Sequence, residues 1–135
     1  MVEIKVEFKG NLSTELTHLD SGAKLLTDAP KDNQGEGKSF SPTDMVAGAL
    51  ASCMLTIMAI YAKRTGIDLT GVKGKVLKEM TTTPPRRIQK LSVSFQMPKR
   101  LSDAERKALE TAALTCPVHR SLRPEVEVPV QFEYV

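Results

Sequence analysis

The sequence predicts an α+β fold in a single domain, residues 1–135. Two observations carry this prediction: several segments alternate apolar with charged residues, and one long segment is almost wholly apolar. Alternation with a period of two is typical of half-buried strands, whereas a long apolar run with helix-start signals predicts a helix. A chain of this length forms about one domain and buries roughly two-thirds of its unfolded surface. The predicted order, β-β-β-α-β-β-α-α-β, favours α+β over a doubly wound sheet.

The first forty residues predict a three-stranded meander followed by a loop. Turn residues at Gly10-Asn11 and at 20–22 separate three segments with strand-like patterns. The loop before the long helix is rich in glycine, proline and polar residues, and loops at such junctions often border functional sites. The predicted strands are 2–8, 12–19 and 23–27, and the loop is 29–40.

The long helix is predicted over 41–64, SPTDMVAGALASCMLTIMAIYAKR. Ser41 suits the N-cap, Pro42 the first helical position, and Asp44 the positive end of the helix dipole. Between Met45 and Tyr61 the few hydrogen-bonding side chains are those of Ser52, Cys53 and Thr56. We therefore expect a central helix buried on all sides, with antiparallel sheets wrapped around it. A membrane span is the competing interpretation, and the small residues and polar flanks weigh against it.

The second half of the chain predicts a hairpin, two helices and a last strand. The hairpin joins strands 72–83 and 86–97 across Pro84-Pro85. Ser102 and Glu105 form a capping box for a helix that runs through Leu114. Cys116 as N-cap and Pro117 at the first position predict a short helix to about residue 122. The alternating segment 126–134 predicts the final strand.

Composition excludes several classes of function. The net charge of +3 is spread along the chain, aromatic residues make up 4% and Trp is absent. A nucleic-acid-binding surface would need clustered Lys and Arg with interleaved aromatic residues, so no nucleic-acid partner is expected. The N-terminal segment MVEIKVEFKG alternates charged and apolar residues and does not resemble a signal peptide. We expect a cytoplasmic protein with no membrane segment.

The two cysteines are the candidate reactive residues. In the cytoplasm, two cysteines are more often core residues or redox-active thiols than a structural disulfide. Cys116 would stand at a helix N-terminus near His119 and two arginines, which predicts a lowered thiol pKa. The alternative is that Cys116 is only a small N-cap residue and His119 lies on the surface. Cys53 lies in mid-helix and in apolar surroundings, so when it is considered alone the prediction is an inert core cysteine.

Taken together, the motifs SFSPTDMVAGALASCMLTI and CPVHRSL resemble those of the OsmC/Ohr family of thiol peroxidases. The resemblance implies the OsmC-like fold, an intertwined homodimer with active sites near the interface, and reduction of organic hydroperoxides or hydrogen peroxide. By position, Cys53 matches the peroxidatic cysteine, which becomes a sulfenic acid, and Cys116 matches the resolving cysteine, which closes a disulfide. The resemblance implies no cofactor and no metal. An external dithiol, for example of lipoyl type, would restore both thiols.

The chain departs from the typical peroxidases of the family at two positions. Those proteins have an Arg in an N-terminal strand or loop and a Glu directly after the Pro that begins the long helix. Here Thr43 follows Pro42, and no arginine precedes Arg64. Asp44 is the candidate substitute for the missing Glu, and His119 is a further candidate catalytic residue. Lys24, Lys38 or a residue of the second chain could supply the missing positive charge, and the pattern is closer to the OsmC-like branch.

Two other functions stay open at this point. An OsmC-like fold could hold a small hydrophobic ligand beside the central helix, with the cysteines as redox sensors or core residues. A metal site formed by Cys53, Cys116, His18 and His119 is disfavoured, because these residues lack any recognised ligand spacing.

Overall fold

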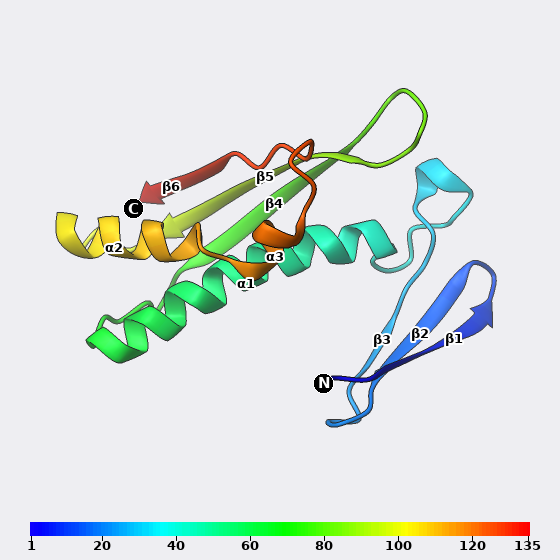
Figure 1. Ribbon diagram of the computed structural model, residues 1–135, viewed down its shortest axis with the longest axis horizontal. Coiled ribbons are helices and arrows are strands. Elements are labelled where there is room, and N and C mark those ends of the chain that lie inside the picture. The colour runs from blue at the N-terminus through cyan, green and yellow to red at the C-terminus, as the bar shows by residue number, and fades with distance from the viewer. The chain divides into compact units, whose positions relative to one another are not determined.

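The computed structural model describes all 135 residues, which form two compact units, residues 1–46 and 47–135. Each unit contains one three-stranded sheet. The predicted element order is confirmed, with one short 3₁₀ helix (η1) added in the loop before the long helix. Figure 1 labels these elements along the chain.

The first unit is an antiparallel meander of β1 (Ile4–Gly10), β2 (Ser13–His18) and β3 (Lys24–Leu26). Gly10 and Asn11 form the predicted turn, and both adopt positive φ angles, 87° and 51°. Glycine and asparagine tolerate this region better than other residues, which explains their position here.

The apolar residues of β1 are not buried within this chain, contrary to the half-buried strand that we predicted. Ile4, Val6 and Phe8 share one face of the strand and are 54%, 61% and 70% exposed. The period of two is correct, but no element of the first unit covers that face. Side chains of this size rarely form an exposed row in a monomer, so the face has the character of an interface.

The loop after β3 contains η1 (Lys31–Asn33) and is tied together by the buried residue Asp28. The Lys38 N–H donates to Asp28 Oδ2 at 3.0 Å, and the Asp28 N–H donates to the Phe40 carbonyl at 3.1 Å. The loop ends at buried Ser41, whose side chain caps the following helix as predicted.

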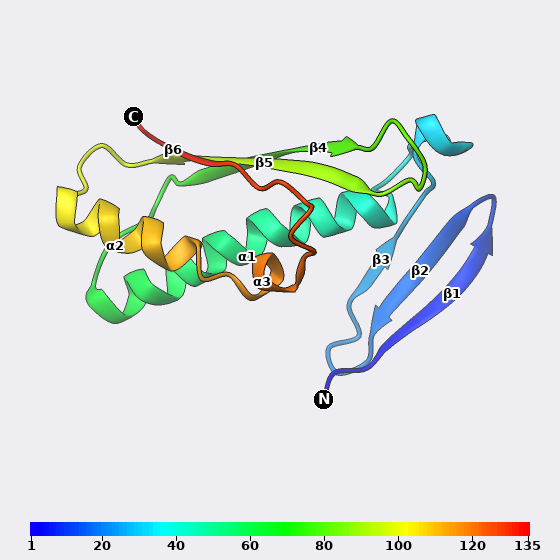
Figure 2. The ribbon, with the colours of Figure 1, turned by 45° about the horizontal axis from the view of Figure 1, so that its top comes forward.

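The second unit packs helices against one face of its sheet (Figures 1 and 2). Leu50, Met54 and Met58 of the long helix are fully buried, as are Leu91 and Phe95 of the sheet. The helices of the unit are α1 (Pro42–Thr65), which begins a few residues before the unit, α2 (Asp103–Ala113) and α3 (Pro117–Ser121). Its strands are β4 (Lys73–Met80), β5 (Ile88–Met97) and β6 (Val130–Tyr134).

The sheet of the second unit is mixed, which corrects the expectation of purely antiparallel sheets. β4 and β5 form the predicted antiparallel hairpin, but β6 pairs with β5 in parallel. The chain between β5 and β6 passes through α2 and α3, and such a crossover allows two neighbouring strands to run in the same direction. β6 is also shorter than predicted, because Pro129 has no N–H to donate to a strand ladder.

The long helix is confirmed, and the second unit by itself buries one face of it. Its buried face carries Ala47, Leu50, Met54, Met58 and Ala62. By length and composition alone α1 could cross a membrane, a test that the core helix of a globular protein also passes. The opposite face is exposed and small or apolar, and it consists of Ala49, Ser52, Thr56, Ala59 and Ile60.

Candidate functional site

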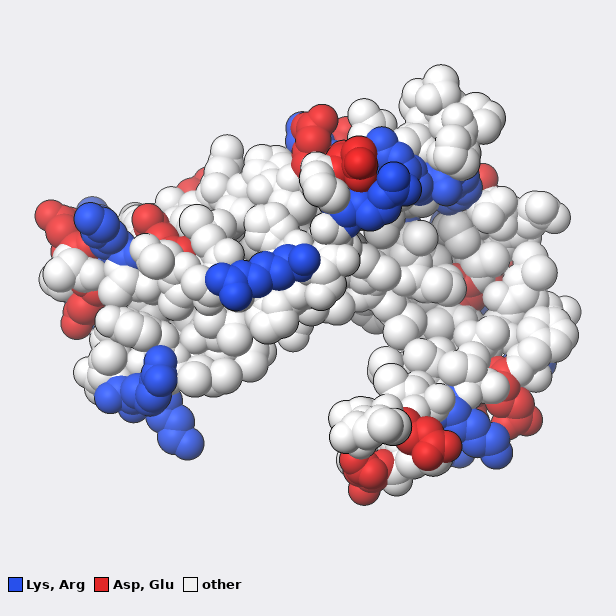
Figure 3. Space-filling view, in the orientation of Figure 1, with Lys and Arg blue, Asp and Glu red and all other residues white.

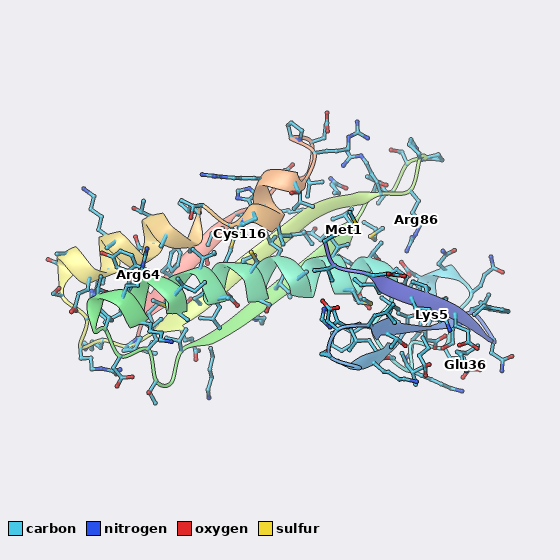
Figure 4. All side chains as sticks on the ribbon, turned by 60° about the horizontal axis from the view of Figure 1, so that its bottom comes forward. Met1, Lys5, Glu36, Arg64, Arg86 and Cys116 are labelled. Atoms are coloured by element: carbon cyan, nitrogen blue, oxygen red, sulfur yellow. The ribbon has the colours of Figure 1, made fainter.

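The fold brings the two cysteines into the same core cluster from distant parts of the chain. Cys53 lies in the middle of α1 and is partly buried, whereas Cys116 is fully buried at the start of α3. Cys116 Sγ lies 4.0 Å from the carbonyl oxygen of Leu50, one helical turn before Cys53. Figure 4 labels Cys116 where α3 begins beside α1. Both thiols are free, so the site is in its reduced form.

The position of Cys116 is set by the helices on either side of it. The predicted capping box is present: the Glu105 N–H donates to Ser102 Oγ, and the Ser102 N–H donates to the Glu105 carboxylate. At the other end of α2, buried Ala113 accepts a hydrogen bond from the Cys116 N–H at 3.3 Å. Cys116 then caps α3, and its sulfur accepts the His119 N–H at 3.4 Å. The predicted N-cap is therefore confirmed.

The predicted low pKa of Cys116 is wrong. Burial raises the pKa of the Cys116 thiol, and a side-chain hydrogen bond with Cys53 raises it further. The N–H groups of His119 and Val118 lower this pKa, but they do not outweigh burial. A five-residue helix provides a weak dipole, while complete burial strongly disfavours a thiolate. Cys116 is therefore the thiol that holds its proton.

The other candidate residues have defined partners. Asp44 Oδ2 accepts the Ser41 N–H at 2.9 Å and so takes part in capping α1. His119 is partly buried and contacts Cys116 through its main-chain N–H. Whether the Asp44 carboxylate and the His119 imidazole take part in chemistry stays a prediction.

Positive charges that were expected near the cysteines pair elsewhere. Arg123 Nε lies 3.1 Å from a Glu125 oxygen, and both side chains are largely exposed. In the first unit, Lys24 lies 3.4 Å from Glu15 and Lys38 lies 2.6 Å from Glu36. Arg64, labelled in Figure 4, stands in the last turn of α1.

Sequence reasoning missed the main-chain groups that surround the Cys116 sulfur. The Leu50 carbonyl and the His119 N–H touch it, and neither contact depends on the type of side chain at those positions. It also missed a polar contact between α2 and β6. The Tyr134 hydroxyl donates to Glu110 Oε1 at 2.6 Å, and the Arg106 guanidinium lies 4.0 Å from the Tyr134 ring centroid. Only the spacing of these residues along amphipathic elements could have signalled it.

The grouping of potential metal ligands and of charged side chains bears on whether a metal ion or a charged partner could bind. No three His, Cys, Asp or Glu side chains are grouped so that they could hold a metal ion. On the face shown in Figure 3, Lys and Arg side chains lie in separate groups, several of them beside acidic residues.

Comparison with known proteins gives a consistent answer. The family model described as OsmC-like protein matches residues 35–131. A crystal structure from Psychrobacter arcticus, of a protein named for an osmotic stress and detoxification response, is 41% identical, has a TM-score of 0.92, and the match covers 98% of this chain and 96% of that one. No curated protein matches the sequence.

More distant structures share the fold. An organic hydroperoxide resistance protein OsmC from Legionella pneumophila is 24% identical with a TM-score of 0.73, and the match covers 98% of this chain and 96% of that one. An organic hydroperoxide resistance protein from Elizabethkingia anophelis is 13% identical with a TM-score of 0.74, covering 100% and 96%. The family model spans both cysteines and most of the chain, and the α+β architecture with its long helix matches these structures. The chain therefore belongs to the OsmC-like family.

Proposed function

We propose that this protein is a cysteine-based peroxidase that reduces organic hydroperoxides or hydrogen peroxide. The observation that carries the proposal is that two free thiols lie in a single core cluster. Cys53 is partly exposed and Cys116 is buried. A peroxidase of this type needs one thiol that a hydroperoxide can reach and a second thiol close enough to close a disulfide. Some proteins of the same fold carry the name organic hydroperoxide resistance protein, which supports the choice of substrate.

In the proposed reaction, Cys53 is the peroxidatic residue. Its thiolate attacks the terminal peroxide oxygen, so an S–O bond forms and the O–O bond breaks. The leaving alkoxide, or hydroxide from hydrogen peroxide, takes up a proton and departs as alcohol or water. Cys53 is now a sulfenic acid. Partial exposure of Cys53 supports this role, since the fully buried Cys116 is not accessible to a peroxide.

Cys116 then resolves the sulfenic acid. Its sulfur bonds to the sulfur of Cys53, the S–O bond breaks, and the hydroxyl group leaves as water with the proton of Cys116. The product is the Cys53–Cys116 disulfide. An external dithiol, of lipoyl type or another kind, reduces it and becomes a disulfide itself. No metal or other cofactor enters this cycle.

We further propose that the active protein is a cytoplasmic homodimer. The exposed face of α1, including Thr56, Ala59 and Ile60, and the exposed apolar row Ile4, Val6 and Phe8 support a self-association. Covering these faces would remove from water the apolar surface that the single chain leaves open.

The test is the identification of the cysteine that forms the sulfenic acid. Cys53→Ser and Cys116→Ser variants are reduced, treated with one equivalent of cumene hydroperoxide in the presence of a sulfenic-acid trap, and analysed by mass spectrometry. The proposal predicts the trapped adduct on Cys53 in Cys116→Ser and none in Cys53→Ser. An adduct on Cys116 in Cys53→Ser would reverse the roles, and no adduct in either would refute the peroxidase.

One alternative function has a specific observation in its favour. The chain has no arginine before Arg64, and Thr43 rather than Glu directly follows Pro42. The resemblance associates that arginine and that Glu with peroxidase activity. An OsmC-like protein without strong peroxidase activity could bind a small hydrophobic ligand or sense redox state. The hollow of about 780 Å³ in the first unit does not suit such a ligand, because charged side chains line it, among them Lys9, Glu15 and Glu36.

A further inference from the structure

We propose that the Cys116 thiol donates a hydrogen bond to the sulfur of Cys53 and thereby stabilises the Cys53 thiolate before a hydroperoxide arrives. This inference rests on the proposed function, because it gives the resolving cysteine a second role in the same site. In that role a neutral thiol does the work that the resemblance assigns to an arginine, a residue that this chain lacks before Arg64.

The helix that carries Cys53 offers its thiolate no charged partner. Between Asp44 and Lys63 no side chain of α1 carries a formal charge in its usual state, apart from an ionised cysteine itself. Lys63 stands ten residues after Cys53, which corresponds to about 15 Å of helix rise. The helix dipole acts mainly within the first turn, and Cys53 lies well beyond it. A Cys53 thiolate therefore needs a donor from another segment.

Cys116 is placed to be that donor. Its Sγ lies against α1, 4.0 Å from the Leu50 carbonyl oxygen, and Leu50 precedes Cys53 by one turn on the same helix. Cys116 and Cys53 pack in one core cluster, and Cys116 is fully shielded from water. In the reduced site the Cys116 thiol donates to the Leu50 carbonyl oxygen at 4.0 Å, a long contact. A neighbouring thiolate is a stronger acceptor than a carbonyl oxygen for a proton that has no solvent to share it.

The main chain of α3 makes Cys116 a better donor. The His119 N–H donates to Cys116 Sγ at 3.4 Å. An N–H that donates to a sulfur draws electron density from it and strengthens the hydrogen bond that the same thiol gives onward. The result is a short relay from the His119 amide through the Cys116 thiol to the Cys53 sulfur.

The pKa of Cys116 fits this direction of the hydrogen bond. Burial is the largest cause of the raised pKa of Cys116, and the hydrogen bond and the charge of Cys53 both raise this pKa further. Besides burial, the groups that act on this pKa are Cys53 and the N–H groups of His119 and Val118, with no Lys, Arg, Asp or Glu side chain among them. Cys116 therefore keeps its proton and has it available for a hydrogen bond.

The same proton serves the second half of the reaction. When Cys53 is a sulfenic acid, its sulfur is the atom that Cys116 must attack, and both residues belong to one core cluster. As the S–S bond forms, the proton leaves Cys116 with the displaced hydroxyl group as water, so charge and atoms balance. A high-pKa resolving thiol thereby avoids a separate ionisation in the buried site.

The experiment compares two variants that each retain Cys53 as the only thiol. Cys116→Ser keeps a hydrogen-bond donor, whereas Cys116→Ala removes it. Thiolate formation is followed against pH by ultraviolet absorbance, with no peroxide present. The proposal predicts that the pKa of Cys53 is about one unit lower in Cys116→Ser than in Cys116→Ala, equivalent to about tenfold more thiolate at a fixed low pH. Equal pKa values, or a lower value in Cys116→Ala, would overturn it.

A matched control and a second measurement guard against altered packing. Ser121→Ala, made in the Cys116→Ser background, removes an exposed hydroxyl of α3 that lies outside the proposed interface and should leave the pKa of Cys53 unchanged. If Cys116→Ser does not fold, Cys53→Ala reports on the intact Cys116 instead. The pKa of Cys116 should then fall below the second ionisation of the wild type, and an unchanged value would contradict the hydrogen bond.

The outcome separates this inference from the proposed function. A difference between the Ser and Ala variants without oxidation by hydroperoxide would support the donor role and refute the peroxidase. Rapid disulfide formation in wild type with equal pKa values in the two variants would support the peroxidase and refute the donor role.

Discussion

Gly74 on β4 provides a direct test of how the core of the second unit is packed against its sheet. A Cβ added at Gly74 would lie 2.8 Å from Phe95 Cε1 and 3.0 Å from Phe95 Cδ1. Phe95 is fully buried, and its ring stacks on Phe132 with centroids 5.7 Å apart. The ring can therefore not move freely to make room. Gly74→Ala should lower the free energy of unfolding.

The size of the effect follows from two opposing contributions. Overpacking a well-filled core costs about 1–3 kcal/mol. Replacing glycine by alanine within a strand returns roughly 0.5–1 kcal/mol, because alanine has less backbone entropy to lose on folding. We expect a net destabilisation of about 1–2 kcal/mol, measured by urea unfolding.

A double-mutant cycle identifies the cause of that destabilisation. In a Phe95→Leu background the ring atoms that crowd Gly74 are gone, so Gly74→Ala should cost at least about 1 kcal/mol less than in wild type. An equal cost in both backgrounds, or a stabilising Gly74→Ala in wild type, would refute the close contact between β4 and the Phe95 ring.

Four further predictions follow from other parts of the chain. Met54→Ala opens a cavity in the fully buried face of α1 and should cost about 2–5 kcal/mol in urea unfolding, with Ser121→Ala on α3 as the exposed control. Ser102→Ala removes the acceptor of the Glu105 N–H and should cost about 1 kcal/mol, and no loss would contradict the capping box. Burial and Glu110 raise the pKa of Tyr134, so the native state keeps this proton when the unfolded chain loses it. Stability from this group is therefore complete below about pH 10 and falls as pH rises further, and Tyr134→Phe should flatten that fall in thermal melts. Ile60→Glu places a charge on the exposed face of α1 and should shift sedimentation from dimer to monomer, whereas a dimer that persists would place the interface elsewhere.

The sequence was sufficient to predict the elements that depend on local signals. The Ser41 and Ser102 caps, the turn at Gly10 and the hairpin across Pro84-Pro85 all occur where they were expected. Each depends on residues a few positions apart, whose backbone preferences and hydrogen-bonding groups act in any fold.

Expectations that depended on which surface covers an apolar face were less successful. The apolar composition of α1 predicts burial on all sides, but within the second unit the face around Thr56 and Ile60 is exposed. Within the first unit, Ile4 and Phe8 of β1 are also exposed, although their alternating pattern predicts a buried face. An apolar pattern predicts that a face avoids water, but it does not identify the surface that covers that face.

In the candidate site too, local motifs were predictive and properties that depend on three-dimensional packing were not. The motifs led to Cys53 and Cys116, which the fold brings into one cluster. The pKa of Cys116 was predicted in the wrong direction, because burial dominates it and Arg123 pairs with Glu125. Desolvation depends on three-dimensional packing, so local sequence cannot reveal it.

The central claim is that Cys53 and Cys116 act together on a hydroperoxide, and the most direct test is intact-mass spectrometry of the wild type. Fully reduced protein is mixed with one equivalent of cumene hydroperoxide and quenched with a thiol-blocking reagent under denaturing conditions. The account predicts that both thiols disappear together as one intramolecular disulfide, with one cumyl alcohol formed per chain oxidised. Two blocked, unoxidised thiols after the hydroperoxide has been offered for several minutes would contradict it.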